Sequence, residues 1–191
     1  MGDRRQVLAE GATDYVLEHG LLDLSLRPLA AALGTSDRML LYHFGDKLNL
    51  VATVLRVSND RSVKGIRDLE PSADLHAAII ELWDAISSPQ QARSQRLYVE
   101  AAALGVLGTE PFASVVAEAN EVWLGALADH FVASGVQWSS APRAARLVEA
   151  AFMGLQLDEP LEPAAEVRRS VRDLADAVTS LWGPGSRRVA E

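Results

Sequence analysis

The sequence predicts an all-α protein of about nine helices joined by short links. Apolar residues recur at helical spacing along almost the whole chain of 191 residues, and no stretch shows the sustained alternation of a half-buried strand. Glycine and proline separate the periodic stretches, as helix ends and helix starts require. These observations favour helices packed on helices over any arrangement that contains a sheet.

Two helices are expected at the N-terminus. The first carries an apolar face that includes Val7 and Val16, and Gly20 ends it because glycine readily adopts the backbone conformation found at helix C-termini. Ser25 is the expected cap of the second helix, which ends at Gly34.

The third and fourth helices follow without a long loop. Ser36 is expected to cap the third, a short helix whose inward residues Leu40 and Phe44 are four positions apart and therefore share a face. Gly45 closes this helix, and Asp46 is expected to cap a longer fourth helix.

Longer helices are expected in the remainder of the chain, where prolines mark the helix starts. Proline lacks a backbone N–H and fits best in the first turn of a helix. The expected ranges are about 72–88, 90–107, 111–134, 141–157 and 163–182. Residues 183–191 are expected to form a flexible tail.

Composition excludes several classes of protein. The chain has no cysteine, which excludes disulfides, cysteine-bound zinc and a cysteine nucleophile. No apolar run reaches membrane-spanning length and the N-terminus has no signal-peptide core, so a cytoplasmic protein without membrane contact is expected. The net charge of −8 argues against nonspecific coating of nucleic acid. Residues 1–56 hold six Lys/Arg against seven Asp/Glu, so this third is close to neutral and the excess acid lies beyond it.

The second and third helices together form a helix-turn-helix. Only residues 34–36 separate them, and these small residues let two short helices cross steeply. With Leu40 and Phe44 in the core, another face of the third helix is free to enter a DNA groove. That face carries Asp37, Arg38, Met39, Tyr42 and His43. Arginine can read guanine or hold a phosphate, and tyrosine and histidine can contact phosphates or base edges. The spacing alone also fits a purely structural helical corner.

The stretch SLRPLAAALGTSDRMLLYHFGDKLNLV resembles the DNA-binding domain of TetR-family transcriptional regulators. The matching positions are Leu29, Ala30, Leu33, Gly34, Ser36, Leu40, His43, Phe44 and Lys47. The resemblance extends over about residues 7–55. It implies a DNA-binding domain at 1–56, with its motif at about 25–44.

The resemblance implies DNA contacts position by position. Arg27 matches a position that reaches a base or a phosphate, and Lys47 matches a phosphate clamp at a helix start, where the helix dipole adds to its charge. The full predicted set is Ser25, Arg27, Ser36, Arg38, Met39, Tyr42, His43 and Lys47. Leu41 departs from the family, which usually has tyrosine there, and Tyr42 is expected to supply the missing hydroxyl. Asp37 would repel a phosphate and is expected to stay solvated.

The resemblance further implies that residues 57–182 form a helical ligand-binding and dimerisation domain. The candidate ligand-binding residues are Trp83, Tyr98, Phe112, Trp123, Leu127, Phe131 and Met153. The chain has 4 Trp, 3 Tyr and 4 Phe, and this high share of tryptophan suits a cavity for a flat or greasy molecule. For each of these residues, ordinary core packing is the alternative that the sequence favours.

The last two helices carry apolar stripes with small residues that allow close approach. Two such helices from each subunit make a four-helix dimer interface, as the resemblance implies. The candidate interface residues are Leu147, Ala151, Leu155, Val171, Leu174 and Val178.

No constellation in the sequence points to an enzyme, a metal site or a cofactor. His76 and His130 lie on separate predicted helices, and neither has a His, Asp or Glu three or four positions further on. The acidic stretch 157–163 is broken by proline and is expected to be a solvated loop. No nucleophile triad, phosphate loop or dinucleotide fingerprint is present.

The sequence therefore predicts a ligand-responsive, homodimeric transcription factor that acts as a repressor. Its partners would be a double-stranded DNA operator and a small, mostly apolar effector. The alternative is an all-helical ligand- or protein-binding module that keeps the helix-turn-helix only as scaffold, which the near-neutral N-terminal third supports. A small helical enzyme is a third option that no set of residues supports.

Overall fold

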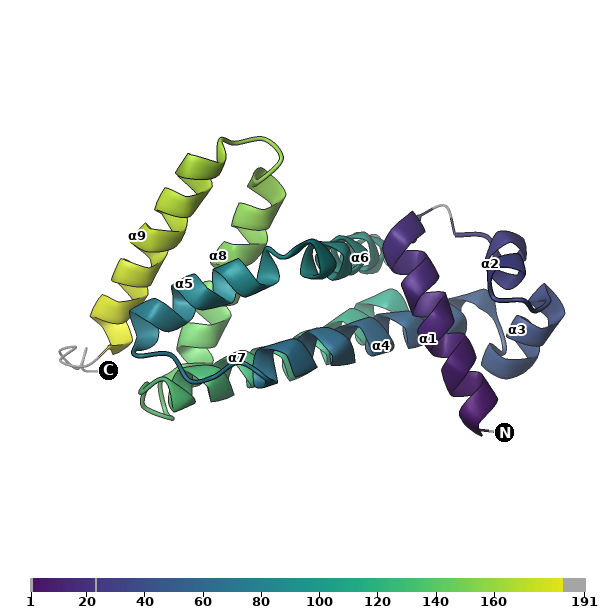
Figure 1. The fold of residues 1–191 in the computed structure, drawn as a ribbon, viewed down its shortest axis with the longest axis horizontal. Helices are drawn as coiled ribbons and strands as arrows, with labels where there is room; N and C mark the ends of the chain where they lie inside the picture. The colour runs from purple at the N-terminus through teal and green to yellow at the C-terminus, as the bar shows by residue number, and fades with distance from the viewer. Residues whose placement is uncertain (1, 23, 184–191) are drawn as a thin grey trace. The chain divides into compact units, whose positions relative to one another are not determined.

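A computed structural model describes residues 2–22 and 24–183, and within these residues the chain is entirely helical (Figure 1). The elements are α1 (Gly2–His19), α2 (Leu26–Ala32), α3 (Asp37–Phe44), α4 (Lys47–Arg67), α5 (Leu75–Ile86), α6 (Pro89–Val106), α7 (Phe112–Ala133), α8 (Ala141–Asp158) and α9 (Ala164–Trp182). The predicted all-α class is confirmed. Of the predicted tail, only Gly183 lies within the described residues.

The chain divides into two compact units. Unit 1 comprises Met1–Val63 and Pro89–Glu121, and it holds α1, α2, α3, α6, most of α4 and the first half of α7. Unit 2 comprises Lys64–Ser88 and Val122–Glu191, and it holds α5, α8, α9 and the second half of α7. The boundary expected after residue 56 falls inside α4, and the helix-turn-helix segment is only a part of unit 1.

Two glycines end the short helices around the helix-turn-helix, as predicted. Gly34 has φ +61° and Gly45 has φ +86°, a backbone region that L side chains rarely adopt. At Gly45 the chain also closes α3 with a hydrogen bond from its N–H to the carbonyl of Leu41 at 2.8 Å. Any other residue at these two positions would therefore strain the entry to α3 or the exit from it.

The predicted caps occupy the predicted positions, with one difference. Ser36 Oγ accepts a hydrogen bond from the Met39 N–H at 3.2 Å, and Asp46 Oδ1 accepts one from the Asn49 N–H at 2.7 Å. Ser25 is the N-cap residue of α2, but its side chain makes no capping hydrogen bond. The Ser25 hydroxyl is thus not committed to α2.

The inner faces of α2 and α3 are buried in the core of unit 1. Both helices pack on each other and on α1. Leu29 of α2 and Leu40 of α3 are 0% and 1% exposed, and Phe44 is 6% exposed at the end of α3. These residues belong to one buried apolar cluster that also contains residues of α1, α4, α6 and α7. The orientation of α3 is therefore set by burial and not by the turn alone.

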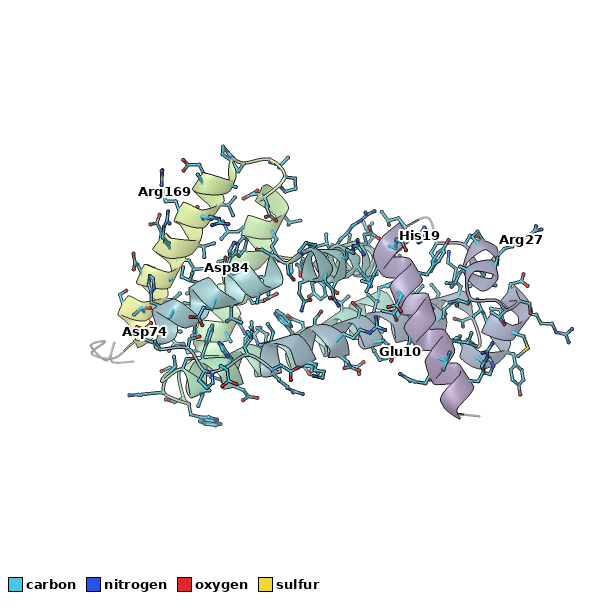
Figure 2. All side chains as sticks on the ribbon, in the orientation of Figure 1. Glu10, His19, Arg27, Asp74, Asp84 and Arg169 are labelled. Carbon is cyan, nitrogen blue, oxygen red and sulfur yellow. The ribbon has the colours of Figure 1, made fainter. Side chains whose placement is uncertain are left out.

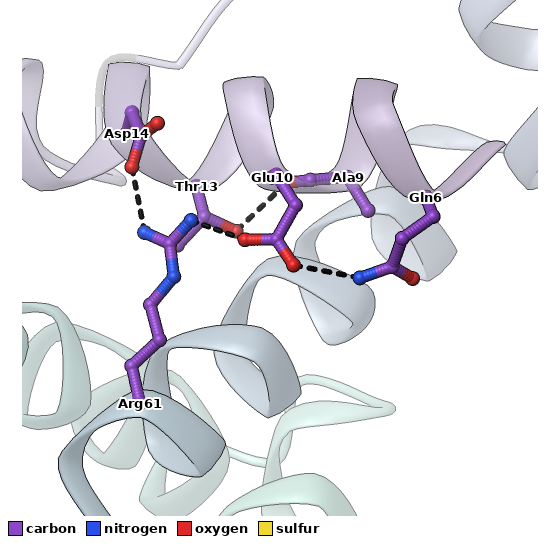
Figure 3. Close-up of polar contacts among 6 residues, drawn as sticks. All are labelled: Gln6, Ala9, Glu10, Thr13, Asp14 and Arg61. Atoms are coloured by element: carbon purple, nitrogen blue, oxygen red, sulfur yellow. Dashed lines mark hydrogen bonds and ion pairs between the residues drawn. The ribbon is translucent and has the colours of Figure 1, made fainter. Parts of the chain in front are cut away.

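Arg61 joins α4 to α1 by ion pairs. Its Nη1 donates to Asp14 Oδ1 at 2.6 Å, and its Nη2 donates to Glu10 (Figure 3). Gln6 donates to the other oxygen of Glu10 at 2.6 Å. Each partly exposed pair stabilises the fold by only about 0–1 kcal/mol. They add a polar contact between α4 and α1 at the edge of the buried apolar cluster.

The core of unit 2 is built on α9, which packs against α5 and α8. Figure 1 shows α8 and α9 as neighbouring helices joined by a short loop. Val171 and Val178 of α9 are 2% and 0% exposed, so they are covered by the chain's own helices. The placement of both valines at a second subunit stays a prediction, and their burial within one chain leaves them little surface for a direct contact.

The structure contains, within the described residues, no helix that is both long and apolar enough to cross a membrane.

Candidate nucleic-acid interface

The helix-turn-helix presents the outer face of α3 to solvent. Arg38, Met39 and Tyr42 are exposed, with Tyr42 at 64% and Met39 at 42%. His43 is partly exposed, and its ring meets the Tyr42 ring edge-on at a centroid distance of 5.2 Å. The face thus offers a guanidinium, a thioether chain, a phenol and an imidazole, all groups that can contact a base edge or a phosphate.

Arg5 of α1 supports α3 and was not singled out from the sequence. Its Nε donates to the backbone carbonyl of His43 at 3.2 Å, and its guanidinium lies over the Phe44 ring at 5.2 Å from the centroid. The carbonyl of His43 lies in the last turn of α3, where helical carbonyls lack intrahelical partners. A cation is favourable at this end of a helix. Arg5 therefore fixes the C-terminal end of α3 to α1.

Asp37 begins α3 and is exposed, as expected for a solvated carboxylate. Its Oδ1 accepts a hydrogen bond from the Arg38 N–H at 2.9 Å, so it satisfies a free N–H of the first turn. Leu41, the position without the family's tyrosine, is 40% exposed. Its side chain is apolar, so it cannot supply the hydroxyl contact.

Three predicted DNA-binding residues lie outside α3, on α2, on α4 and just before α2. Arg27 is exposed on α2 and points away from it (Figure 2). Lys47 is the exposed first residue of α4, and the uncommitted Ser25 precedes α2. Asp46 adjoins Lys47, and its Oδ2 also accepts from Asn49 Nδ2 at 3.0 Å. Acidic and basic side chains are neighbours on this surface, so it is not a continuous basic patch. Binding to DNA would therefore depend more on specific hydrogen bonds and ion pairs than on long-range electrostatic attraction.

The candidate ligand-binding residues are divided between the two units. Tyr98 and Phe112 belong to unit 1, where Phe112 is 4% exposed and lies in the core cluster. Leu127 and Phe131 of unit 2 are 1% and 0% exposed. Trp83, 5% exposed, meets the Phe152 ring edge-on at 5.2 Å. Core packing accounts for all of these buried residues.

Trp123 and Met153 are the two candidates of unit 2 that stay partly exposed. Trp123 Nε1 donates to Glu149 Oε2 at 2.6 Å, which ties α7 to α8. Met153 lies four residues after Glu149 on α8, so both share a helix face. Burial raises the pKa of Glu149, and the hydrogen bond from Trp123 opposes that rise. Glu149 was missed because one glutamate on a helix has no sequence signal that distinguishes it from a solvated one.

His130 is buried near the end of α7, at 6% exposure. Burial lowers its pKa, and the nearby Glu81 carboxylate works in the opposite direction. Its Nε2 makes no hydrogen bond within the part of the chain that the structure describes. His76 Nε2 lies 3.3 Å from Asp176 Oδ1 of α9. In residues 2–22 and 24–183, no three His, Asp or Glu side chains gather as a metal site would require.

The remaining candidate dimer residues keep some exposed surface. Leu147 of α8 is 42% exposed, and Ala151, Leu155 and Leu174 are partly exposed. The first three recur every four residues and form one stripe along α8.

Several solved structures that share this fold are described as transcriptional regulators. A transcriptional regulator from Rhodococcus sp. RHA1 is 20% identical with a TM-score of 0.75, covering 94% of this chain and 98% of its own. A TetR transcription regulator from Haloarcula marismortui is 20% identical with a TM-score of 0.70, covering 95% and 99%. A proposed regulator from Saccharomonospora viridis, solved with choline, is 16% identical with a TM-score of 0.68, covering 95% and 98%. No protein-family model matches the sequence, and no curated protein matches it. The chain has the fold of TetR-family transcriptional regulators.

Proposed function

We propose that this protein is a ligand-responsive, DNA-binding transcriptional regulator that represses its target genes in the cytoplasm. One observation carries the proposal: the outer face of α3 exposes Arg38, Met39 and Tyr42, while Leu40 and Phe44 anchor its inner face. A helix held in this way can lie in a major groove without rearrangement. The exposed side chains of Tyr42 and Met39 leave apolar and polar surface on this face that is available to a partner.

Each exposed polar group has a role in this proposal. Arg38 reads a guanine through O6 and N7, the contact for which arginine is best suited. Lys47 and Arg27 hold phosphates on either side, and Ser25 has a hydroxyl free to donate to one. Lys47 acts together with the N-terminus of α4, where backbone N–H groups favour an anion. Tyr42 and His43 contact the backbone or neighbouring base edges.

A dimer gives the protein two copies of α3 and therefore a near-palindromic operator. The stripe of Leu147, Ala151 and Leu155 along α8, with Leu174 of α9, supplies the apolar surface for a twofold interface. One subunit alone would contact only one half-site. Two linked half-sites bind far more tightly because the second contact becomes intramolecular.

The effector is a small, mostly apolar molecule that carries a positive charge. Trp123, Glu149 and Met153 support this because they combine an indole, a largely buried carboxylate and a thioether in unit 2. An organic cation would neutralise Glu149 and lie against an aromatic face. The neighbour from Saccharomonospora viridis holds choline, an organic cation of this kind. Such an effector releases DNA only if it binds the DNA-incompetent state more tightly.

Binding to DNA from upstream of the protein's own gene tests the proposal. Fluorescence anisotropy should show saturable binding to this DNA and at least about 1000-fold weaker binding to unrelated DNA of equal length. Lys47→Ala should weaken both complexes alike and reduce the salt slope by about one. Equally weak binding to both DNAs, together with a selection from random DNA that enriches no motif, would favour the alternative of a ligand- or protein-binding module that keeps the helix-turn-helix only as scaffold.

A further inference from the structure

Met39 occupies a position on α3 where a hydrogen-bonding residue would be expected. Its side chain is 42% exposed, and its backbone N–H donates a hydrogen bond to Ser36 Oγ. Successive residues of an α-helix are about 100° apart, so Arg38 and Tyr42 lie roughly opposite Leu40, whereas Met39 lies about 100° from Leu40 and about 60° from Tyr42. Met39 is therefore on the exposed side of α3, beside Tyr42 and near the N-terminus of the helix. Residues there are the ones that reach base edges in helix-turn-helix complexes.

The chemistry of methionine limits what it can recognise in a major groove. Its thioether is a weak acceptor and has no hydrogen to donate, so it cannot read the amino, carbonyl or ring-nitrogen pattern of a base pair. The one apolar group that a base presents in this groove is the 5-methyl group of thymine. A flexible, polarisable side chain adapts well to such a group.

We propose that Met39 is a specificity-determining residue that reads a thymine through its 5-methyl group, one base pair from the guanine contacted by Arg38. This inference rests on the proposed function, since it requires α3 to lie in the major groove. It adds that each half-site contains a guanine next to a preferred thymine. Asp37 and Arg38, the other residues of this turn, are both charged, so the methyl contact falls to Met39.

Leu41 provides a matched comparison on the same helix. It is 40% exposed, close to the value for Met39, and it is also apolar. It lies about 160° around the helix from Met39, on the flank of the groove-facing side. If exposed apolar surface alone caused the preference for thymine over uracil, replacing either residue would reduce that preference. The proposed contact predicts that only replacement of Met39 reduces it.

Deoxyuridine substitution tests the contact, because uracil lacks only the methyl group of thymine. The operator is first defined by selection from random DNA, and each thymine is then replaced singly by deoxyuridine. One thymine per half-site should be sensitive, with about a fourfold loss of wild-type affinity, the factor that corresponds to burying one methyl group. Replacing it in both half-sites should cost about sixteenfold.

Variants of Met39 and Leu41 test which residue causes the preference for thymine over uracil. Met39→Ala should bind the thymine and uracil operators equally, at about the affinity of wild type for the uracil form, while Met39→Leu and Leu41→Ala should keep the fourfold preference. Loss of the preference in Leu41→Ala, or its persistence in Met39→Ala, would overturn the assignment to Met39. A selected operator without any uracil-sensitive thymine would refute the inference but leave the proposed function standing. A selection that yields no motif would refute both.

Discussion

Arg5 of α1 donates a hydrogen bond to the backbone carbonyl of His43, over 3.2 Å, at the end of α3. The same guanidinium covers the Phe44 ring. The helix proposed to enter the DNA groove is thus held by an arginine that lies 38 residues earlier in the chain.

Replacing Arg5 should weaken operator binding by misorienting α3. The bond to His43 and the contact with Phe44 together are worth about 1 kcal/mol, so Arg5→Ala should lower operator affinity about fivefold. Arg4→Ala is the control, because it removes the same charge from the same helix and should reduce affinity less. Anisotropy titrations at several salt concentrations distinguish the two. Equal losses with equal changes in salt slope would show that Arg5 contributes only its charge.

The hydrogen bond between Trp123 and Glu149 should control the effector response. Glu149→Gln removes the negative charge but preserves the size of the side chain. It should abolish any preference for choline over its neutral isostere 3,3-dimethyl-1-butanol, measured by quenching of tryptophan fluorescence. Operator affinity without effector should stay within about twofold of wild type, since typical coupling between sites requires a bound effector. A variant that keeps the wild-type preference for the cation would remove Glu149 from the effector site.

Unfolding free energy should fall as the pH drops below about 6.5 because of His130. Burial lowers the pKa of His130 in the folded protein, so the unfolded chain binds the proton more readily and acid favours unfolding. This loss should begin near the unfolded pKa and continue down to the lowered folded pKa. Urea unfolding of His130→Gln should show a shallower decline than wild type, by up to about 1.4 kcal/mol per pH unit. Identical slopes would mean that His130 is free to charge in the fold.

Glu149 should make the unfolding free energy fall as the pH rises, which is the opposite of the effect of His130. Burial raises the pKa of its carboxyl, so the folded protein keeps a proton that the unfolded chain releases. Its stabilising contribution is complete at low pH and is lost as the pH rises through the folded pKa. The ordinary pKa of glutamate, about 4.3, sets the lower limit of the pH range in which this loss occurs. Between about pH 4.5 and 7, the unfolding free energy of Glu149→Gln should therefore fall less with rising pH than that of the wild type. A steeper loss in the variant would contradict the burial of this carboxyl.

The local signals in the sequence predicted the helices well. Gly34 and Gly45 end α2 and α3 because few other residues tolerate their backbone angles, and Ser36 and Asp46 cap the following helices. Ser25 was correctly placed at the N-cap, but the hydrogen bond itself depends on a side-chain rotamer that the pattern does not determine. Helix ends are local events, so a local pattern is sufficient to find them.

The faces of the longer helices could not be predicted in the same way. Phe112 and Val178 are predicted at a ligand site and a dimer surface, and both side chains are buried within the chain, so burial alone leaves these assignments as predictions. An apolar stripe indicates that a face is covered but not whether the chain's own helices or a partner cover it. Arg5 and Glu149 were missed because their partners, a backbone carbonyl and an indole on other helices, have no signature in the sequence.

The dimer surface should be sensitive to charge on α8. Leu147 is 42% exposed, so Leu147→Glu should leave the unfolding free energy within about 0.5 kcal/mol of the wild-type subunit and yet dissociate the dimer. Val178→Glu is the contrasting variant, because it buries a charge within the chain and should unfold the protein. Light scattering at micromolar concentration measures the assembly. A wild-type monomer, or a Leu147→Glu protein that remains fully dimeric, would exclude this face as the interface.

Selection of binding sites from random double-stranded DNA, with wild-type and Arg38→Ala proteins in parallel, tests the central claim most directly. The wild-type protein should enrich a near-palindromic motif with a guanine in each half-site. Arg38→Ala should bind that motif about 1–3 kcal/mol more weakly and accept other bases at the guanine position. A wild-type selection without any enriched motif, or an Arg38→Ala selection that returns the same motif with the same stringency, would contradict the assignment of the α3 face to sequence-specific DNA binding.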